Sequence, residues 1–366
     1  MNTGFDFNER PFLVIWETTH ACDLACQHCR AQAEPEPAAH ELSTDEAKKL
    51  IDDVAAMRTP ILVFSGGDPL KRPDIVTLVR YAKDRGIRTG VIPAATPLLT
   101  HEKIRELRDA GLSQIAFSLD AATAAEHDAF RRVEGVFERT LDAVRYANLI
   151  GLPVQINSLV NVHNTEKLDD LIALIESLNI VFWEVFFLVP MGRGKDLQLP
   201  SAAAFDAVFE KLYALSKRAP FVLKITEAPH FRQFVHRRNA SARLAGTVQM
   251  PEELRKRTGP GGTIGHAPEG VNAGKGFAFV SCEGDVFPSG FLPITAGNVR
   301  NESLPDIYRG SALFRILRDV TQLKGRCRVC EYASICGGSR SRAFALTGDF
   351  LAEDPCCSYD PLLKTA

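Results

Sequence analysis

Six runs of consecutive apolar residues recur along the first half of the chain, separated by stretches whose apolar positions repeat every three or four residues. Continuous apolar runs are typical of strands that are covered on both faces, as in a parallel sheet. The predicted strands span 12–17, 61–65, 88–93, 115–119, 153–160 and 182–188. The stretches between them predict helices at 43–57, 74–85, 101–110, 136–150 and 166–178. The first helix opens with Ser43 and Glu46 in the spacing of a capping box.

This alternation predicts an α/β fold with a parallel sheet and right-handed crossovers. Six βα units are too few for a closed eight-stranded barrel, so we expect a partial (β/α)6 TIM barrel over residues 1–235. A further helix at 202–218 and a short apolar run from Val222 complete this part. In such a barrel the functional site lies at the C-terminal ends of the strands.

The second half of the chain has a different composition. Residues 236–275 are rich in glycine and basic side chains, which predicts a linker or a lid over the site. Residues 276–366 are too few to enclose a large core of their own. A metal cluster would supply the missing stability, so we expect a small C-terminal auxiliary-cluster domain there.

Charge and hydropathy narrow the possible partners and location. The 43 basic and 45 acidic side chains nearly balance, which gives no electrostatic reason to expect nucleic acid or an anionic membrane as a partner. The first twelve residues carry acidic side chains and lack the apolar core of a secretory signal. No apolar run approaches the roughly 20 residues that cross a bilayer. We therefore expect a cytoplasmic protein that binds neither nucleic acid nor membrane.

Eight of the nine cysteines fall into two groups, which predicts two metal sites rather than disulfides. The first group is Cys22, Cys26 and Cys29, directly after the first predicted strand. The second group consists of Cys327, Cys330, Cys336, Cys356 and Cys357. Cys282 stands alone and is expected to be a core residue.

The first group has the spacing C-x3-C-x2-C in the sequence CDLACQHC. Three thiolates hold three irons of a [4Fe–4S] cluster and leave the fourth iron open to another molecule. A zinc knuckle is the alternative, with His28 as the fourth ligand.

This cysteine motif, placed after a first strand and followed by βα units, resembles the radical S-adenosylmethionine (SAM) superfamily. The resemblance implies that SAM chelates the open iron and is cleaved reductively to methionine and a 5′-deoxyadenosyl radical, which abstracts hydrogen. It also implies SAM contacts after successive strands, with Asp68 where glutamate is more frequent and Arg131 on the SAM carboxylate. The implied contacts are His28, Gly66, Gly67, Asp68, Ser118, Asp120, Arg131, Asn157, Val160 and Met191.

The C-terminal cysteines, C-x2-C-x5-C followed by Cys356-Cys357, resemble a reduced SPASM extension of that superfamily. Ser289 and Arg340 stand where such extensions usually have cysteines. The resemblance therefore implies one auxiliary [4Fe–4S] cluster that relays electrons. Its ligands would be Cys327, Cys330, Cys336 and either Cys356 or Cys357. A zinc ion bound by four cysteines is the alternative.

The opening segment, TEAPH at 226–230 and GGSRSRAF at 337–344 resemble a subgroup that includes alternative-haem-pathway synthases and peptide-modifying SPASM enzymes. This implies a small-molecule or tetrapyrrole substrate, with decarboxylation, dehydrogenation or rearrangement as the outcome. The reductant would be a protein such as flavodoxin or ferredoxin. Arg193, Glu227 and His230 follow strand ends and are candidate substrate contacts.

Two other functions remain open. The chain would be a maturase of a ribosomally made peptide if a separate partner binds the leader, since the first strand begins too early for a leader-binding domain before it. It would be a non-catalytic metal-binding scaffold if the SAM contacts were incomplete.

Overall fold

The computed structural model describes residues 5–241 and 270–362. Most of the segment predicted as a linker or lid, 236–275, lies outside these ranges. None of the described helices is both long enough and apolar enough to span a membrane.

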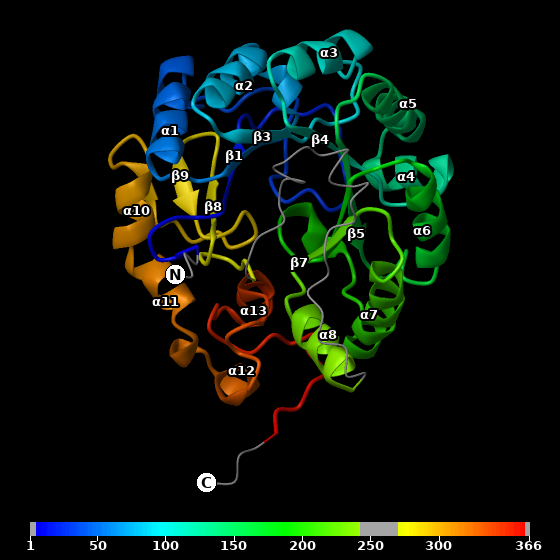
Figure 1. The fold of residues 1–366 in the computed structure, drawn as a ribbon, viewed down its shortest axis with the longest axis vertical. Coiled ribbons are helices and arrows are strands. Elements are labelled where there is room, and N and C mark those ends of the chain that lie inside the picture. Colours follow the sequence, from blue (N-terminus) through cyan, green and yellow to red (C-terminus); the bar gives the residue numbers. More distant parts are fainter. Residues whose placement is uncertain (1–4, 242–269, 363–366) are drawn as a thin grey trace.

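All six predicted strands form, and they lie in chain order in one parallel sheet (Figure 1). They are β1 (Leu13–Glu17), β2 (Ile61–Ser65), β3 (Arg88–Val91), β4 (Gln114–Ser118), β5 (Val154–Val160) and β6 (Phe182–Phe187). Two further parallel strands extend the sheet, β7 (Val222–Thr226) beside β6 and β8 (Phe277–Val280) beside β1. Beyond β8, the antiparallel strands β9 (Asp285–Phe287) and β10 (Gly297–Asn298) complete ten strands among the described residues.

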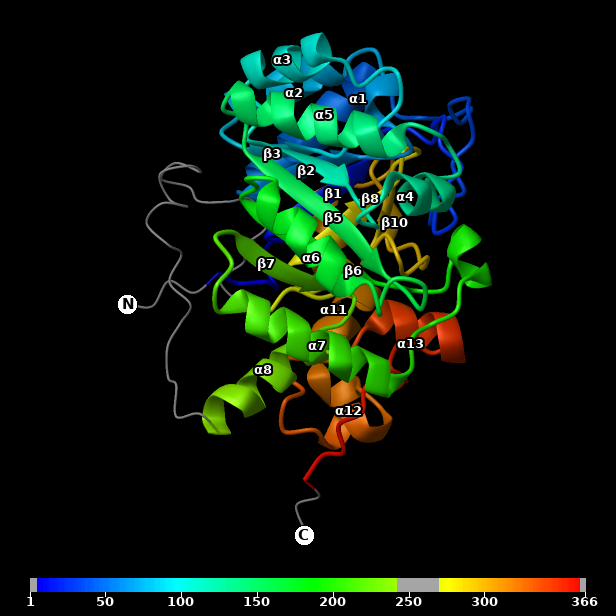
Figure 2. The ribbon, with the colours of Figure 1, turned by 90° about the vertical axis from the view of Figure 1, so that its right-hand side faces the viewer.

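Helices cover the outer face of this curved sheet, with α3 and α5 on one side of the molecule and α7 and α8 on the opposite side (Figure 2). The barrel helices are α1 (Thr44–Ala56), α2 (Ile75–Asp84), α3 (His101–Asp109), α4 (Ala124–Arg131), α5 (Val136–Leu149), α6 (Leu168–Ser177), α7 (Ala202–Ser216) and α8 (His230–Ser241). The predicted capping box is confirmed, because Ser43 N donates to Glu46 Oε2 at 2.8 Å and Glu46 N donates back to Ser43 Oγ. Helix α4 was not predicted, since its eight residues are too few to show a clear period.

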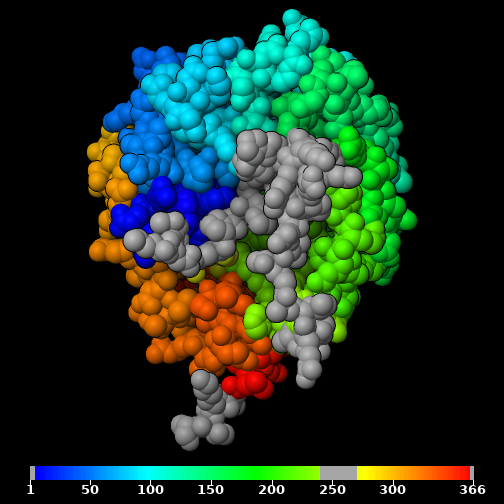
Figure 3. Space-filling view, in the orientation of Figure 1, coloured from blue at the N-terminus to red at the C-terminus, as the bar shows by residue number. Residues whose placement is uncertain are grey.

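The C-terminal segment is joined to the barrel through strand β8. Its described helices are α10 (Leu304–Gly310), α11 (Ala312–Arg318), α12 (Gly325–Val329) and α13 (Arg340–Thr347), with a 3-10 turn at Val320–Gln322. Two other 3-10 turns, Pro69–Lys71 and Gly192–Asp196, lie in the barrel. Strand β8 joins the barrel sheet, and the buried Tyr308 donates to Phe7 O at 2.8 Å. Figure 3 shows the orange C-terminal helices against the blue N-terminal segment. The sheet therefore continues across the boundary expected at residue 276.

A buried ion pair ties the end of the chain to the barrel. Arg342 and Asp354 are both fully buried, 3.1 Å apart. Arg342 also donates to the carbonyl of Glu227, directly after β7, and His230 Nδ1 lies 3.5 Å from the Asp354 carboxylate. Burial would raise the pKa of Asp354, but Arg342 and His230 hold it well below its usual range. The carboxylate is therefore charged and depends on Arg342 for compensation.

We predict that Arg342→Met lowers the free energy of unfolding by about 3–5 kcal/mol, because it leaves the Asp354 carboxylate buried without its main partner. Lys324→Met is the matched control, since its ion pair with Asp349 is largely exposed and contributes little. The free energy of unfolding of each variant is measured on the iron-loaded protein by urea titration followed by circular dichroism. Equal midpoints for the two variants would contradict a structural role for the buried pair.

Candidate functional site

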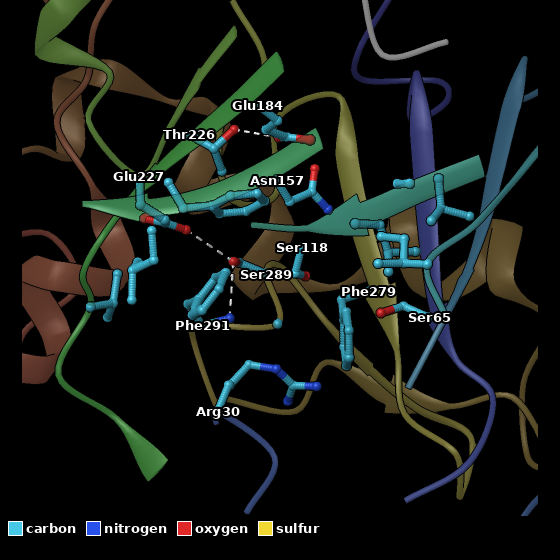
Figure 4. A pocket seen from close by; sticks show the side chains of 18 of the residues that line it. Arg30, Ser65, Ser118, Asn157, Glu184, Thr226, Glu227, Phe279, Ser289 and Phe291 are labelled. Carbon is cyan, nitrogen blue, oxygen red and sulfur yellow. Dashed lines mark hydrogen bonds between the residues drawn. The ribbon is translucent and has the colours of Figure 1, made fainter. Parts of the chain in front are cut away.

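A cavity of about 360 Å³ occupies the interior of the barrel (Figure 4). Every strand from β1 to β8 contributes at least one side chain or glycine to its wall: Ile15, Val63, Gly90, Ala116, Gln155, Glu184, Lys224 and Phe279. A closed TIM barrel fills this space with branched apolar side chains. The hollow interior therefore leaves room for a ligand.

The three N-terminal cysteines line one end of this cavity. Cys22 and Cys26 are buried, and Cys29 is half-buried. Burial raises the pKa of Cys22 to about 12, so its thiol stays protonated until a metal binds and displaces the proton. Within the described residues, no three His, Cys, Asp or Glu side chains are arranged to hold a single metal ion. The three thiols therefore face the cavity without being preset around a single ion.

His28 faces the same cavity, where its ring stacks on Phe130 with centroids 4.8 Å apart and planes 3° apart. Burial, with a smaller contribution from Arg131, lowers the pKa of His28 to about 3, so the ring is neutral. Its Nδ1 is buried without a hydrogen-bond partner among the described residues. A flat, neutral ring on the cavity wall, with an unpaired nitrogen, is able to contact a ligand in the cavity.

Gly66 and Gly67 line the cavity and lie against the loop that carries the cysteines. A Cβ on Gly67 would lie 2.2 Å from Ala21 O, and one on Gly66 would lie 2.7 Å from Thr19 O. Gly67 N donates to Thr19 O at 2.8 Å. The two glycines are therefore required by the close approach of the cysteine loop.

Arg131 links the fourth strand's end to the cysteine loop. Its Nε donates to Asp120 Oδ2 at 2.9 Å, and its Nη1 donates to Cys26 Sγ at 3.6 Å. The neighbouring Arg132 is exposed and ends α4 in the left-handed region, at φ 59°. Burial would raise the pKa of Asp120, but Arg131 and the nearby histidines lower it, so the pair is charged. Of the two arginines, only Arg131 reaches the cavity.

Ser118 and Asn157 are register partners on β4 and β5, and both line the cavity. Val160 does not line it. Gln155, Asn157, Ser158 and Leu159 line the cavity, whereas Val160 is 1% exposed and packs in the hydrophobic core. The expected SAM contact at Val160 is therefore not brought into this wall.

Two other expected contacts also lie outside the cavity wall. Met191 is half-buried beside it, and Asp68 is fully buried and directed into its own turn. Asp68 accepts hydrogen bonds from Leu70 N at 3.1 Å and from Thr96 Oγ1 at 2.8 Å. Its carboxylate thus fixes the turn that presents the two glycines.

The cavity walls differ in polarity, a feature that the sequence analysis missed. On one side, Glu184 forms an ion pair with Lys224 at 2.8 Å and accepts hydrogen bonds from Gln155 at 3.1 Å and Thr226 at 2.5 Å (Figure 4). The other side is apolar and is made of Leu13, Ile15, Ile61, Val63, Phe277 and Phe279. In the sequence, the polar wall is indicated only by one charged residue in each of two apolar strands, Glu184 in β6 and Lys224 in β7.

Glu227 lies where the barrel meets the C-terminal segment. It has φ 60°, a conformation that is strained for a residue with a side chain. Its carboxylate accepts hydrogen bonds from Ser289 at 3.3 Å, Ser341 at 3.1 Å and Ser339 at 2.5 Å. Glu227 lines the cavity, and its pairing with Ser289 is visible in Figure 4.

The other two candidate substrate residues lie elsewhere. Arg193 donates to Cys26 O at 2.9 Å and to Ala33 O, so it supports the cysteine loop. His230 lies beside Asp354 and lines a second, smaller cavity. Neither of them lines the main cavity.

The second cavity, about 30 Å³ in volume, is lined by four cysteines of the C-terminal group: Cys327, Cys330, Cys336 and Cys357. Cys356 does not line it and is buried in the hydrophobic core. Gly338 N donates to Cys336 Sγ at 3.4 Å. The structure thus brings four cysteines together and separates Cys356 from Cys357. Cys282 is buried away from both cavities, as expected.

Comparisons with known proteins agree with this arrangement. Residues 16–178 match the model of the radical SAM superfamily, and residues 272–331 match that of SPASM, an iron–sulfur cluster-binding domain. The chain is 40% identical to an AdoMet-dependent heme synthase of Methanosarcina barkeri, covering 96% of this chain and 97% of that protein. It is 29% identical to a PqqA peptide cyclase of Bradyrhizobium diazoefficiens, covering 97% and 88%.

The fold also matches a solved structure. Streptococcus suis SuiB bound to S-adenosylmethionine superposes with a TM-score of 0.73 at 16% identity, covering 96% of this chain and 78% of that one. This chain therefore belongs to the radical SAM superfamily and is a radical SAM enzyme with a SPASM iron–sulfur domain.

Proposed function

We propose that this enzyme abstracts hydrogen from a tetrapyrrole held in the barrel cavity, with Cys22, Cys26 and Cys29 holding the SAM-binding [4Fe–4S] cluster. When bound, that cluster supplies the electron that cleaves SAM reductively. We assign these three cysteines as the cluster ligands because all of them line one end of the hollow barrel. No fourth cysteine lines that cavity among the described residues, which leaves one iron open for SAM.

Residues around the cysteines are placed to orient SAM. Arg131 uses three of its five N–H groups on Asp120 and Cys26, so two remain for the SAM carboxylate. His28 offers a neutral flat ring to the adenine, and Ser118 and Asn157 offer polar groups from adjacent strands. Arg131, His28 and Asn157 are each held by neighbouring contacts, so little of their conformational entropy is lost on binding.

The polarity of the cavity supports a tetrapyrrole substrate. A tetrapyrrole has a flat apolar macrocycle with carboxylates on its edge, and the cavity has an apolar wall opposite the Glu184–Lys224 wall. Phe277 and Phe279 would contact the macrocycle. Within the described residues Lys224 pairs with Glu184, and its ammonium has three N–H donors, so it is able to bind a substrate carboxylate as well. The 40% identity to a heme synthase supports the same substrate class.

A peptide substrate is the second candidate, favoured by the similarity to a peptide cyclase at 29% identity. The net reaction would be a decarboxylation, dehydrogenation or rearrangement of the tetrapyrrole, or a crosslink in the peptide. In either case the electron would come from a reductant such as flavodoxin or ferredoxin.

We expect Cys357→Ala to remove the auxiliary cluster and Cys356→Ala to leave it in place, because only Cys357 lines the cavity with the other three cysteines. Iron analysis after anaerobic reconstitution should give about eight irons per chain for Cys356→Ala and about four for Cys357→Ala. The reverse order would show that the two cysteines have been assigned wrongly.

The substrate proposal is tested by titrating the reconstituted enzyme with iron coproporphyrin, a tetrapyrrole with four carboxylates, and following the porphyrin absorbance. Lys224→Met should weaken binding about tenfold, equivalent to roughly 1.4 kcal/mol for one charged contact. Lys224→Arg should restore part of the affinity. Lys211→Met, which removes a surface lysine paired with Asp169, is the matched control and should bind like the wild type.

The same samples are assayed for 5′-deoxyadenosine with SAM and dithionite. Porphyrin-dependent formation supports the proposal. If neither the wild type nor any of the three variants binds the porphyrin, the tetrapyrrole proposal is excluded and a peptide substrate is favoured.

A further inference from the structure

Two arginines separate the main cavity from the four auxiliary cysteines. Arg232 in α8 and Arg340 at the start of α13 both line the main cavity. The side chain of Arg340 is 3% exposed, and that of Arg232 is half-buried. Burying a cation costs free energy unless a negative group lies nearby.

Neither guanidinium has a carboxylate within ion-pair distance in the described part of the chain. Arg232 donates to Val271 O at 2.5 Å, to Ile335 O at 3.2 Å and to the Asn272 side chain. Arg340 donates to Phe350 O at 2.9 Å and Ala352 O at 2.8 Å. These hydrogen-bond partners are neutral, although the charge of Arg340 contributes to lowering the pKa of Asp349, whose own ion-pair partner is Lys324.

Both arginines do approach the auxiliary cysteines. Arg340 Nη2 lies 3.9 Å from Cys327 Sγ, within hydrogen-bond distance for sulfur. Arg232 bonds to the carbonyl that precedes Cys336, and Asn272, which it also contacts, donates to Cys336 O at 2.7 Å. The negative charge that would balance these cations is that of the four thiolates with their cluster.

We propose that Arg232 and Arg340 raise the reduction potential of the auxiliary cluster and so adapt it to accept an electron from the side of the main cavity. This inference rests on the proposed ligand set. Positive charge and hydrogen bonds to sulfur favour the more negative, reduced cluster, so both act in the same direction. One electron is added to the oxidised cluster, and no bond is made or broken. In turnover the donor is the substrate after hydrogen abstraction, and in the test it is dithionite.

Arg326 differs from Arg232 and Arg340 in its partners, which supports a specific role for those two arginines. Arg326 also lies in the auxiliary segment, but it pairs with Glu353 at 3.0 Å and with Asp360 at 3.3 Å. Its charge is thereby balanced by carboxylates. Within the described residues, Arg232 and Arg340 form no ion pair with a carboxylate, which places their positive charge on the side from which an electron would come.

The test uses the full chain with Cys22, Cys26 and Cys29 all changed to alanine, so that only the auxiliary cluster gives an electron paramagnetic resonance signal. Redox titrations compare this protein with versions that also carry Arg340→Met, Arg232→Met or Arg328→Met. Arg328 is next to Cys327 but exposed to solvent, so it is the matched control.

At the starting protein's midpoint potential, Arg340→Met or Arg232→Met should lower the ratio of reduced to oxidised cluster about tenfold, a shift of about 59 mV for one electron. Arg328→Met should leave the ratio unchanged. If Arg340→Met fails to bind iron, Arg232→Met decides the question, because Arg232 has no recorded contact with a cysteine sulfur. An intact signal that does not shift in these two variants overturns the inference. No signal and no bound iron in the starting protein would instead overturn the proposed auxiliary cluster.

Discussion

The cysteine loop between β1 and α1 has little regular structure, and the rest of the site depends on how its backbone is held. Loops from later βα units supply the hydrogen bonds. Gly67 donates to Thr19 O at 2.8 Å, Gln27 N donates to Phe130 O at 3.0 Å, and Arg193 N donates to Cys29 O at 3.0 Å. Three thiolates reach one cluster only if this loop has a single conformation. Residues that follow β2 and β6, together with Phe130 in α4, therefore hold the cysteine loop in place.

Contacts between distant parts of the chain also hold the C-terminal segment in place. Arg342 joins Asp354 to the carbonyl of Glu227, and three serines from the C-terminal segment converge on the Glu227 carboxylate. These contacts set the position of the auxiliary cysteines relative to the barrel. Glu227 adopts a strained backbone conformation, which these surrounding contacts hold in place. The auxiliary site is thus built onto the cavity wall, with Arg232 and Arg340 between the two sites.

Much of the fold was predictable because burial on both faces leaves a continuous apolar pattern in each central strand. Strand β8 was not predictable, since its four residues gain their partner β1 only through a contact between distant parts of the chain. The continuity of the sheet across residue 276 follows from that pairing. Local pattern carries no information about such a partner.

Features of the site that depend on residue spacing could be predicted from the sequence. Features that depend on the direction of a side chain could not. Cysteine spacing predicted two groups of thiols, each of which lines a cavity, and the motif after β2 located the glycine turn. The SAM contact predicted at Val160 stays a prediction, and the side chain itself lies outside the cavity wall because the direction of a residue at a strand end depends on the register. The choice between Cys356 and Cys357 likewise depends on tertiary packing. The Glu184–Lys224 wall was missed because a single charge in an apolar run does not reveal its partner on another strand.

If one chain holds an open cluster facing the cavity and a closed cluster behind two arginines, the two clusters must respond differently to SAM. This is measured by the electron paramagnetic resonance spectrum of the dithionite-reduced, reconstituted enzyme before and after SAM is added. We expect two overlapping signals, of which one changes when SAM binds to its open iron and the other stays the same. A spectrum in which neither signal changes, or in which both change, would contradict it.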